Sequence, residues 1–229
     1  DFNSKALLKY LNKELGNWKS KQSFEHLSTE HKDYPAQKVH ALAEQRQFGN
    51  YQGFLAIPVG TDHKDAAALI VFSNILGDSQ LSSRLAMELR EKNALVYGFG
   101  SNLNLDALSD VGALMISANY TEGKSAQVSQ VVHKVLTDML TKGVTEQELE
   151  AAKADIMKQR VTTLEDERRI HRMLNSQLER NKNLLNRAER DKEFASLTKA
   201  DVDAVIKKYI KLDHFVEVMA DQYGKEQKK

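Results

Sequence analysis

The sequence predicts an α+β fold, with a mixed, largely antiparallel sheet and helices packed on one face of it. Strand-like runs separated by turn residues fill the first part of the 229-residue chain. Residues 144–223, in contrast, contain neither glycine nor proline and are typical of consecutive helices joined by polar turns. Residues 214–219 alternate and predict a last strand that returns to the sheet, and this order of elements favours the α+β class.

Residues 1–34 are expected to form a helix and an inter-domain linker, and residues 35–229 an α/β domain. Leucines at helical spacing predict a helix from about residue 6 to residue 15, which Gly16 ends. The polar stretch that follows has no clear period and is typical of a segment on the surface.

Two strands are expected to open the domain. Residues 39–43 and 51–58 are rich in apolar and aromatic side chains, and we predict a turn at Gly49 and Asn50 between them. The Gly-x-Gly at residues 98–100 falls within another predicted strand, so it does not predict a phosphate-binding loop.

The middle of the chain predicts two helices and a hairpin. The first helix should run from about residue 64 to residue 76, with Thr61 or Asp62 as its cap, and its almost continuous apolar surface predicts deep burial. A second helix is expected at about residues 80–92. Residues 96–105 and 111–120 alternate well enough to predict two paired strands.

The remaining elements are helical. Valines and leucines spaced by three and four between residues 128 and 140 predict an amphipathic helix that Gly143 ends. Capping boxes that begin at Thr145 and Thr198 predict two further helix starts. The charge-rich stretch from Glu165 to Arg190 is expected to be a solvated helix face that lines a chamber or docks a neighbour.

Composition excludes several classes of protein. The chain has 33 Lys and Arg against 32 Asp and Glu, a net charge of +1, and an evenly mixed charge does not predict nucleic-acid binding. No apolar run approaches the roughly 20 residues of a membrane span. The lack of cysteine excludes disulfides and is compatible with an oxidising compartment, so we expect a soluble, periplasmic protein. Because the chain opens at Asp1 and not at Met, we interpret it as a piece of a longer protein.

The histidines predict no metal site. A zinc-binding helix needs two histidines four residues apart with a glutamate between them, and the sequence contains no such set. His26, Glu30 and His31 come nearest, but an i, i+5 pair does not share one helix face. His133 is expected to be a partly exposed helix residue. Motifs for a serine nucleophile, a phosphate loop or a dinucleotide site are also missing.

The most informative segment is residues 81–98, LSSRLAMELREKNALVYG. It resembles the insulinase/pitrilysin (inverzincin) zinc peptidases, whose non-zinc domain carries a helix ending in Leu-Arg-Glu-Lys, a short turn and a strand that opens with Tyr. Arg90 and Tyr97 have the family's spacing. The likeness extends to Asn-Ile-Leu-Gly at residues 74–77 and to Gly143-Val-Thr-Glu-Gln-Glu-Leu, and Asp1-Phe2 with Gly-Asn-Trp at residues 16–18 resembles the family's inter-domain joint.

The resemblance implies a metallopeptidase (LuxS/MPP-like) domain in a clam-shell chamber built from homologous domains. One domain of the family holds zinc through an inverted His-x-x-Glu-His motif, and another supplies the Arg and Tyr. This chain has the pair and lacks the motif, so the resemblance implies the non-zinc, C-terminal domain of a zinc endopeptidase. Arg90 and Tyr97 would be its catalytic and substrate-binding residues, which bind the substrate carbonyl and stabilise the tetrahedral intermediate. No metal ligand or cofactor is expected in this chain.

The partners implied by the resemblance are a zinc-bearing homologous domain or subunit and a peptide substrate, held as an extended strand on a sheet edge. The chain alone is not predicted to be an enzyme, whereas the intact protein would be a zinc metalloendopeptidase. The alternative is a catalytically inert scaffold or binding subunit of the same family. Without the resemblance, Arg90 would be read as a helix-end residue that interacts with the helix dipole, and Tyr97 as a core residue. Arg84 is expected to be structural.

Overall fold

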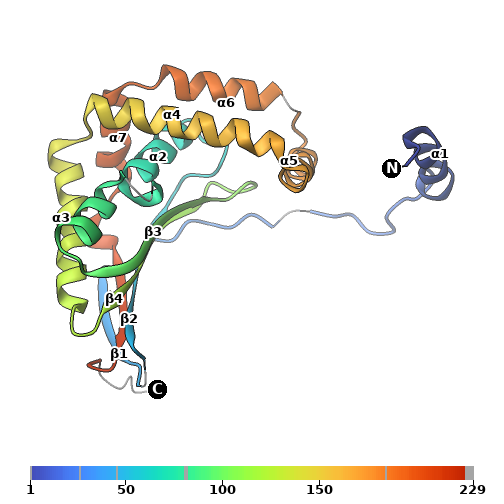
Figure 1. Ribbon diagram of the computed structural model, residues 1–229. Coiled ribbons are helices and arrows are strands. Elements are labelled where there is room, and N and C mark those ends of the chain that lie inside the picture. Colours follow the sequence, from blue (N-terminus) through green and yellow to red (C-terminus); the bar gives the residue numbers. More distant parts are fainter. Residues whose placement is uncertain (1, 26, 45, 80–81, 184, 225–229) are drawn as a thin grey trace.

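The computed structural model describes residues 2–224 except 26, 45, 80, 81 and 184. It confirms the α+β class, with a five-stranded mixed sheet in the order β1-β5-β2-β4-β3 and helices on one face (Figure 1). Strands β1 and β5 are parallel, and the three other neighbouring pairs are antiparallel, so β1 and β3 form the sheet edges. The strands are β1 (Gln37–Leu42), β2 (Phe48–Ile57), β3 (Val96–Leu105), β4 (Gly112–Thr121) and β5 (Val216–Asp221).

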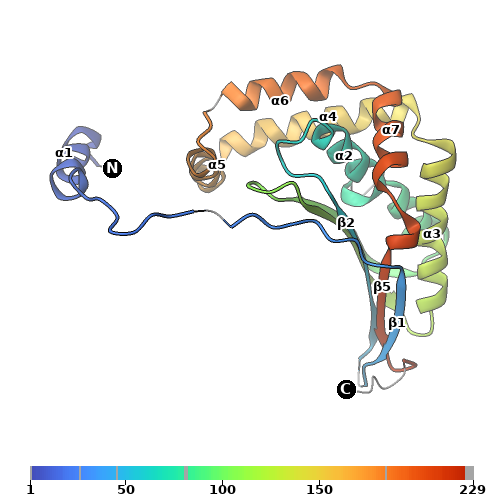
Figure 2. The same ribbon diagram turned by 180° about the vertical axis from the view of Figure 1, so that it is seen from behind.

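The helices gather on one side of the sheet, and the opposite face has no helix packed on it in the described part of the chain (Figure 2). Helix α6 runs beside α4, and α1 lies away from the body at the end of an extended segment. The helices are α1 (Ser4–Leu15), α2 (Ala66–Ser73), α3 (Ser125–Lys142), α4 (Glu146–Thr162), α5 (Glu167–Glu179), α6 (Leu185–Ser196) and α7 (Lys199–Tyr209), with short η segments at Asn74–Asp78, Ala86–Lys92, Thr163–Glu165 and Leu212–His214. None of the helices within the described residues combines the length and the apolar character that crossing a bilayer requires.

Both predicted capping boxes are confirmed. The hydroxyl of Thr145 accepts a hydrogen bond from the backbone N–H of Glu148 at 3.1 Å, and the Glu148 carboxylate accepts one from the backbone N–H of Thr145 at 2.7 Å. Thr198 and Asp201 form the same reciprocal pair. Each box satisfies two N–H groups that a helix start otherwise leaves unpaired, which is why these helices begin where the sequence predicts.

The predicted cap of the buried helix was wrong. Helix α2 begins at Ala66 without a side-chain cap, because its candidate caps are used elsewhere. The Thr61 hydroxyl donates to the carbonyl of Leu105 at 3.0 Å, and the Asp62 carboxylate pairs with Arg180. The following predicted helix is shorter than expected: residues 80 and 81 lie outside the described residues, and helical geometry begins at Arg84.

The predicted turn at Gly49 and Asn50 was also wrong. Both residues lie inside β2, where Gly49 pairs with Tyr120. A Cβ atom on Gly49 would lie 2.0 Å from the Tyr120 ring, so this glycine is required for close packing and not for a turn. The chain turns before Phe48, and β1 and β2 are not neighbours because β5 lies between them.

The two faces of the sheet differ sharply. On the covered face, alternate residues of β2 and β4 such as Tyr51, Leu55 and Ile116 are fully buried against the helices. On the open face, where the other residues of each strand point, the side chains are uncharged. Apart from glycines they are Gln37, Val39, Ala41, Phe48, Asn50, Gln52, Phe54, Ala56, Tyr97, Asn102, Asn104, Ala113, Met115, Ser117, Asn119, Thr121, Val216, Val218 and Ala220.

With 28% of the chain charged, an ordinary solvent-facing set of this size would carry several charges. The open face is therefore unusually neutral. The ring of Tyr34, in the extended segment before β1, packs edge-on against Phe54 on this face with the centroids 6.2 Å apart.

Candidate functional site

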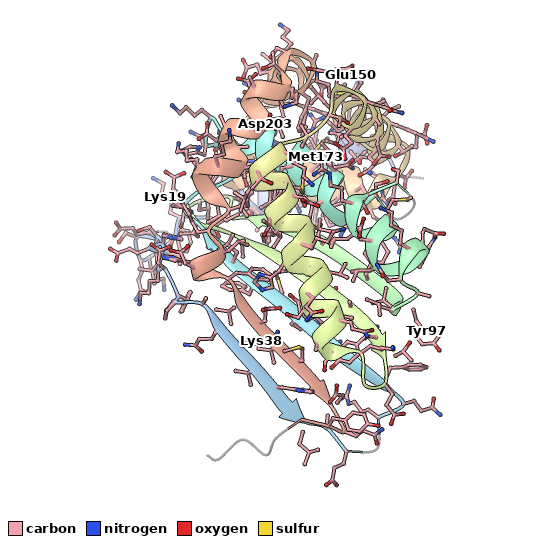
Figure 3. The ribbon with its side chains drawn as sticks, turned by 90° about the vertical axis from the view of Figure 1, so that its left-hand side faces the viewer. Lys19, Lys38, Tyr97, Glu150, Met173 and Asp203 are labelled. Carbon is pink, nitrogen blue, oxygen red and sulfur yellow. The ribbon has the colours of Figure 1, made fainter. Side chains whose placement is uncertain are left out.

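Arg90 and Tyr97 lie on one helix–turn–strand unit. Arg90 belongs to the η segment Ala86–Lys92, and Tyr97 is the second residue of β3. The connecting turn docks on the hairpin, because the backbone N–H of Thr121 donates to the carbonyl of Leu95 at 3.0 Å. Tyr97 is 69% exposed, so the alternative that it is a core residue is wrong. Figure 3 shows it at one end of the sheet, away from the helical layer that contains Met173.

A β-bulge decides which way Tyr97 points. Val96 pairs with Tyr120 and Gly98 pairs with Asn119, so Tyr97 is an extra residue with no partner on β4. Simple alternation from buried Phe99 would place residue 97 on the covered face. The extra residue lets Val96 take the inward position and turns Tyr97 to the open face, and bulges commonly re-aim a side chain in this way.

The turn before the bulge is irregular as well. Arg90 lies in π-helical geometry, and Ala94 has a positive φ of 48°. The backbone N–H of Leu95 donates to the carbonyl of Leu89 at 2.9 Å, and that of Ala94 to the carbonyl of Arg90 at 3.1 Å. These two bonds resemble the pair of backbone hydrogen bonds that commonly ends a helix, except that each of them spans one more residue. Strained backbone of this kind clusters at functional sites.

Ala94→Gly is expected to stabilise the protein. Alanine is penalised in the left-handed region by about 1 kcal/mol relative to glycine, and Ala94 is exposed, so the substitution removes no packing. Urea unfolding should show a free energy of unfolding higher by about 1 kcal/mol. Ala107→Gly, at an exposed position without a positive φ, is the matched control and should lower it slightly. A loss of stability in the Ala94 variant would show that the turn does not hold this strain.

The two candidate side chains have different partners. Arg90 Nε donates to Glu91 Oε1 at 2.9 Å in an ion pair that is roughly half exposed, and such a pair contributes little to stability. The ring of Tyr97 packs against Phe48 at a centroid distance of 4.6 Å and an interplanar angle of 64°. The Arg90 side chain is thus partly exposed and the Tyr97 side chain largely exposed, on the same helix–turn–strand unit. Arg84, in contrast, is structural as predicted, since it binds Glu148 through two nitrogens.

Phe48 is a residue that the sequence analysis missed. It lies on β2, which is separated from β3 by β4, so only the register of three strands brings it to Tyr97. Gly98 adds open surface beside the pair, because a Cβ atom there would meet nothing within 4 Å. Since β3 is a sheet edge, its outer backbone groups have no strand beside them in the described part of the chain.

The histidines of the described residues have structural partners. His31 and His214 both contact the carboxylate of Asp33, at 3.0 and 3.1 Å, and their hydrogen bonds lower the pKa of Asp33. His26 lies outside the described residues. No group of three or more His, Asp or Glu in the described ranges could hold a metal ion, so these residues do not fit zinc.

His133 is partly exposed in α3 as predicted, but the sequence did not reveal its partner. It lies 2.7 Å from Glu217 of β5, a carboxylate that also accepts hydrogen bonds from Ser129 at 2.6 Å and from Tyr51 at 2.9 Å. Glu217 is only 3% exposed. Burial would raise its pKa, but the hydrogen bonds outweigh burial and lower it. The cluster joins β5 and β2 of the sheet to α3, and its hydrogen bonds hold the two layers together.

Asp221 lies four residues after Glu217 on the same face of β5, and its carboxylate is also buried and hydrogen-bonded. Its carboxylate contacts His40 at 2.6 Å and accepts a hydrogen bond from Tyr120 at 2.7 Å. The pKa of Asp221 is lowered despite burial, because hydrogen bonds from Tyr120 and His40 favour the charged form. The two carboxylates fix β5 to its neighbours and to α3.

Known proteins resemble the chain in sequence and in fold. A family model described as the peptidase M16 inactive domain matches residues 1–156. The chain is 28% identical, over 71% of its length, to the uncharacterized zinc protease YmxG of Bacillus subtilis, of which it covers 38%.

Solved structures show the same fold. A protease from Helicobacter pylori matches with a TM-score of 0.82 and 19% identity over 96% of this chain and 53% of its own. A peptidase M16 inactive domain from Pseudomonas fluorescens matches with a TM-score of 0.75 and 23% identity over 89% of this chain and 48% of its own. The chain thus spans about half the length of these structures.

Proposed function

The chain belongs to the peptidase M16 inactive-domain family, in keeping with the resemblance to the insulinase/pitrilysin zinc peptidases, and from this premise we propose that Arg90 and Tyr97 serve a zinc endopeptidase whose metal is held outside this chain. The Helicobacter pylori and Pseudomonas fluorescens structures are about twice as long as the chain. A homologous domain in the remaining length, or on another subunit, would hold the zinc. The periplasmic location expected from the sequence stays a prediction.

The role of the two residues follows from their chemistry. Attack on a peptide carbonyl places negative charge on its oxygen, and donors already aimed at that oxygen lower the barrier. Arg90 offers a planar guanidinium with several N–H donors, and Tyr97 offers a phenolic O–H on a stiff ring. Both can bind the carbonyl before attack and hold the oxyanion after it. The described residues include no group of three or more His, Asp or Glu that could hold a metal ion, so we place the zinc that would activate the attacking water on a partner domain.

The observation that carries the proposal is the bulge at Tyr97. An irregular register costs pairing energy, and here it leaves a tyrosine with 69% of its surface exposed where regular pairing would bury it. A purely structural tyrosine would gain nothing from this arrangement. The ring of Phe48 then limits the positions that the phenol can take.

The substrate that we propose is an extended peptide. The β3 edge beside Tyr97 can pair with a peptide main chain, and Gly98 leaves room above the strand. The uncharged open face of the sheet suits peptide segments with neutral side chains, because a buried charge without a partner would be disfavoured there.

Gly98→Val tests this placement. The new side chain enters open space, so the melting temperature should be unchanged or slightly higher, whereas the peptide would meet a branched side chain next to Tyr97. We expect kcat/KM of the intact protein to fall about tenfold, chiefly through a higher KM. Ala107→Val, at an exposed position of the loop between β3 and β4, is the matched control and should retain the original value. If the protein is only a scaffold, neither variant will have peptidase activity to compare. An unaltered kcat/KM in Gly98→Val would contradict the proposed path of the peptide.

A further inference from the structure

Positive charge gathers around a cavity of about 310 Å³ that the proposed peptidase function does not use. The cavity lies where the loop after β2 meets the end of α4 and the helices α5 and α6. Met173, which lines it, lies among the helices in Figure 3, whereas Tyr97 lies at the other end of the sheet. The basic residues of its lining are Arg160, Arg180, Lys182, Arg187 and Arg190.

The carboxylates near these cations are too few to match them. Asp62 forms ion pairs with two of the cations, and Asp191 and Glu193 form one ion pair each. The ion pairs are Asp62 with Arg180 and Lys182, Asp191 with Arg160, and Glu193 with Arg190. Glu189 also lines the cavity, but it is exposed and accepts a hydrogen bond from Asn186 at 3.4 Å. The walls therefore carry more positive than negative charge.

Arg187 holds the surplus charge. One of its nitrogens donates to the backbone carbonyl of Arg160, and another lies 3.7 Å from the sulfur of Met173. Burial lowers the pKa of Arg187, the positive charge of Arg160 lowers it further, and Asp191 opposes both effects. Two guanidinium groups thus repel each other across a partly enclosed space, and an anion between them would relieve the repulsion.

The cavity also contains buried polar atoms that lack partners. Within the described residues, Arg180 Nε and Gln177 Oε1 are buried without a hydrogen bond, and the Arg180 side chain is only 10% exposed. Buried donors and acceptors are normally paired. One is a donor and the other an acceptor, so a ligand that carries both bare oxygens and a hydroxyl proton would satisfy them together.

We propose that this cavity is a binding site for a phosphate group, either as the free dianion or as the end of a phosphate ester. Guanidinium groups bind phosphate oxygens through paired, charge-assisted hydrogen bonds. Arg180 and Arg187 donate to the oxygens of the ligand. In the free dianion the remaining hydroxyl donates to Gln177 Oε1. The negative charge of the ligand offsets the surplus positive charge on the walls.

Calorimetric titration of the chain at pH 7.5 tests this site. Sodium phosphate, titrated against a sodium chloride background of equal ionic strength, should bind saturably with a dissociation constant of about 1 mM. Glycerol 3-phosphate distinguishes the two sources of the phosphate group: equal or tighter binding would assign the site to an ester, and weaker binding to the free ion. Succinate should bind more weakly than either.

The variants locate the binding. Arg187→Gln should weaken phosphate binding about tenfold, and Arg172→Gln, an exposed arginine of α5, should leave it unchanged. Lys182→Gln, expected to weaken it about threefold, provides the same test if Arg187→Gln does not fold. The proposal is overturned by a lack of saturable phosphate binding, by tighter succinate binding, or by equal losses in the Arg172 and Arg187 variants.

Discussion

Tyr97→Phe in the intact protein is expected to lower kcat about 100- to 1000-fold, which corresponds to roughly 2.7–4 kcal/mol of transition-state stabilisation. The substitution removes only the phenolic oxygen, so the ring can still pack against Phe48. Because Tyr97 is 69% exposed, stability should not change. Zinc content should also stay the same, because the proposal places the metal outside this chain. Steady-state kinetics with metal analysis measures both quantities.

Arg90→Ala is expected to lower kcat of the intact protein by a similar factor. Since we propose that both residues bind one oxygen, kcat of the double variant should fall by less than the product of the two single losses. Tyr10→Phe, at a tyrosine of α1 that is 60% exposed, is the matched control and should keep full activity. Wild-type turnover in both the Arg90 and the Tyr97 variants would refute their catalytic role.

Glu217→Gln should destabilise the domain by about 1.5–3 kcal/mol at neutral pH, because the carboxylate loses charge-assisted hydrogen bonds inside the protein. Its partners Tyr51, Ser129 and His133 come from β2 and α3, so the loss affects the joint between the sheet and the helices. Urea unfolding measures the effect. Glu150→Gln, at a surface ion pair with Lys153, is the control and should cost less than about 1 kcal/mol.

The buried carboxylates of Glu217 and Asp221 predict that the free energy of unfolding depends on pH. The pKa values of Glu217 and Asp221 are lowered in the folded protein, so the unfolded chain binds protons first as the pH falls. Their contribution is complete above the ordinary values of 4.5 and 3.8 and is lost as the pH falls through the lower folded values. The free energy of unfolding should therefore decline below about pH 4.5. In Glu217→Gln, this free energy should decline less steeply with falling pH than in the wild type. An equal slope in the variant would show that Glu217 does not contribute to the decline.

The features that the sequence predicted correctly are local. The capping boxes at Thr145 and Thr198, the glycine that ends α3 and the strand alternation of the β3–β4 hairpin all depend on neighbouring residues. Arg90 and Tyr97 were candidates for the same reason, since the family motif is one continuous segment. Secondary structure can be derived from periodicity, and a linear motif from the resemblance to a family, both without knowledge of the tertiary fold.

The features that the sequence did not reveal depend on register and tertiary packing. Gly49 was assigned to a turn because its close approach to Tyr120 arises only when β2 pairs with β4. The bulge at Tyr97 and the contact with Phe48 need three aligned strands. The charge-rich stretch was expected to be solvated, yet Arg180 and Arg190 are largely buried around a cavity. Long charged side chains can bury their stems in this way.

The most direct test of the central claim is the structure of the intact protein with a phosphinic peptide, whose phosphinyl group imitates the tetrahedral intermediate. The account predicts that a guanidinium nitrogen of Arg90 and the phenolic oxygen of Tyr97 both lie within about 3.2 Å of one phosphinyl oxygen. A complex in which that oxygen is held by other groups, while both side chains face only solvent, would contradict it.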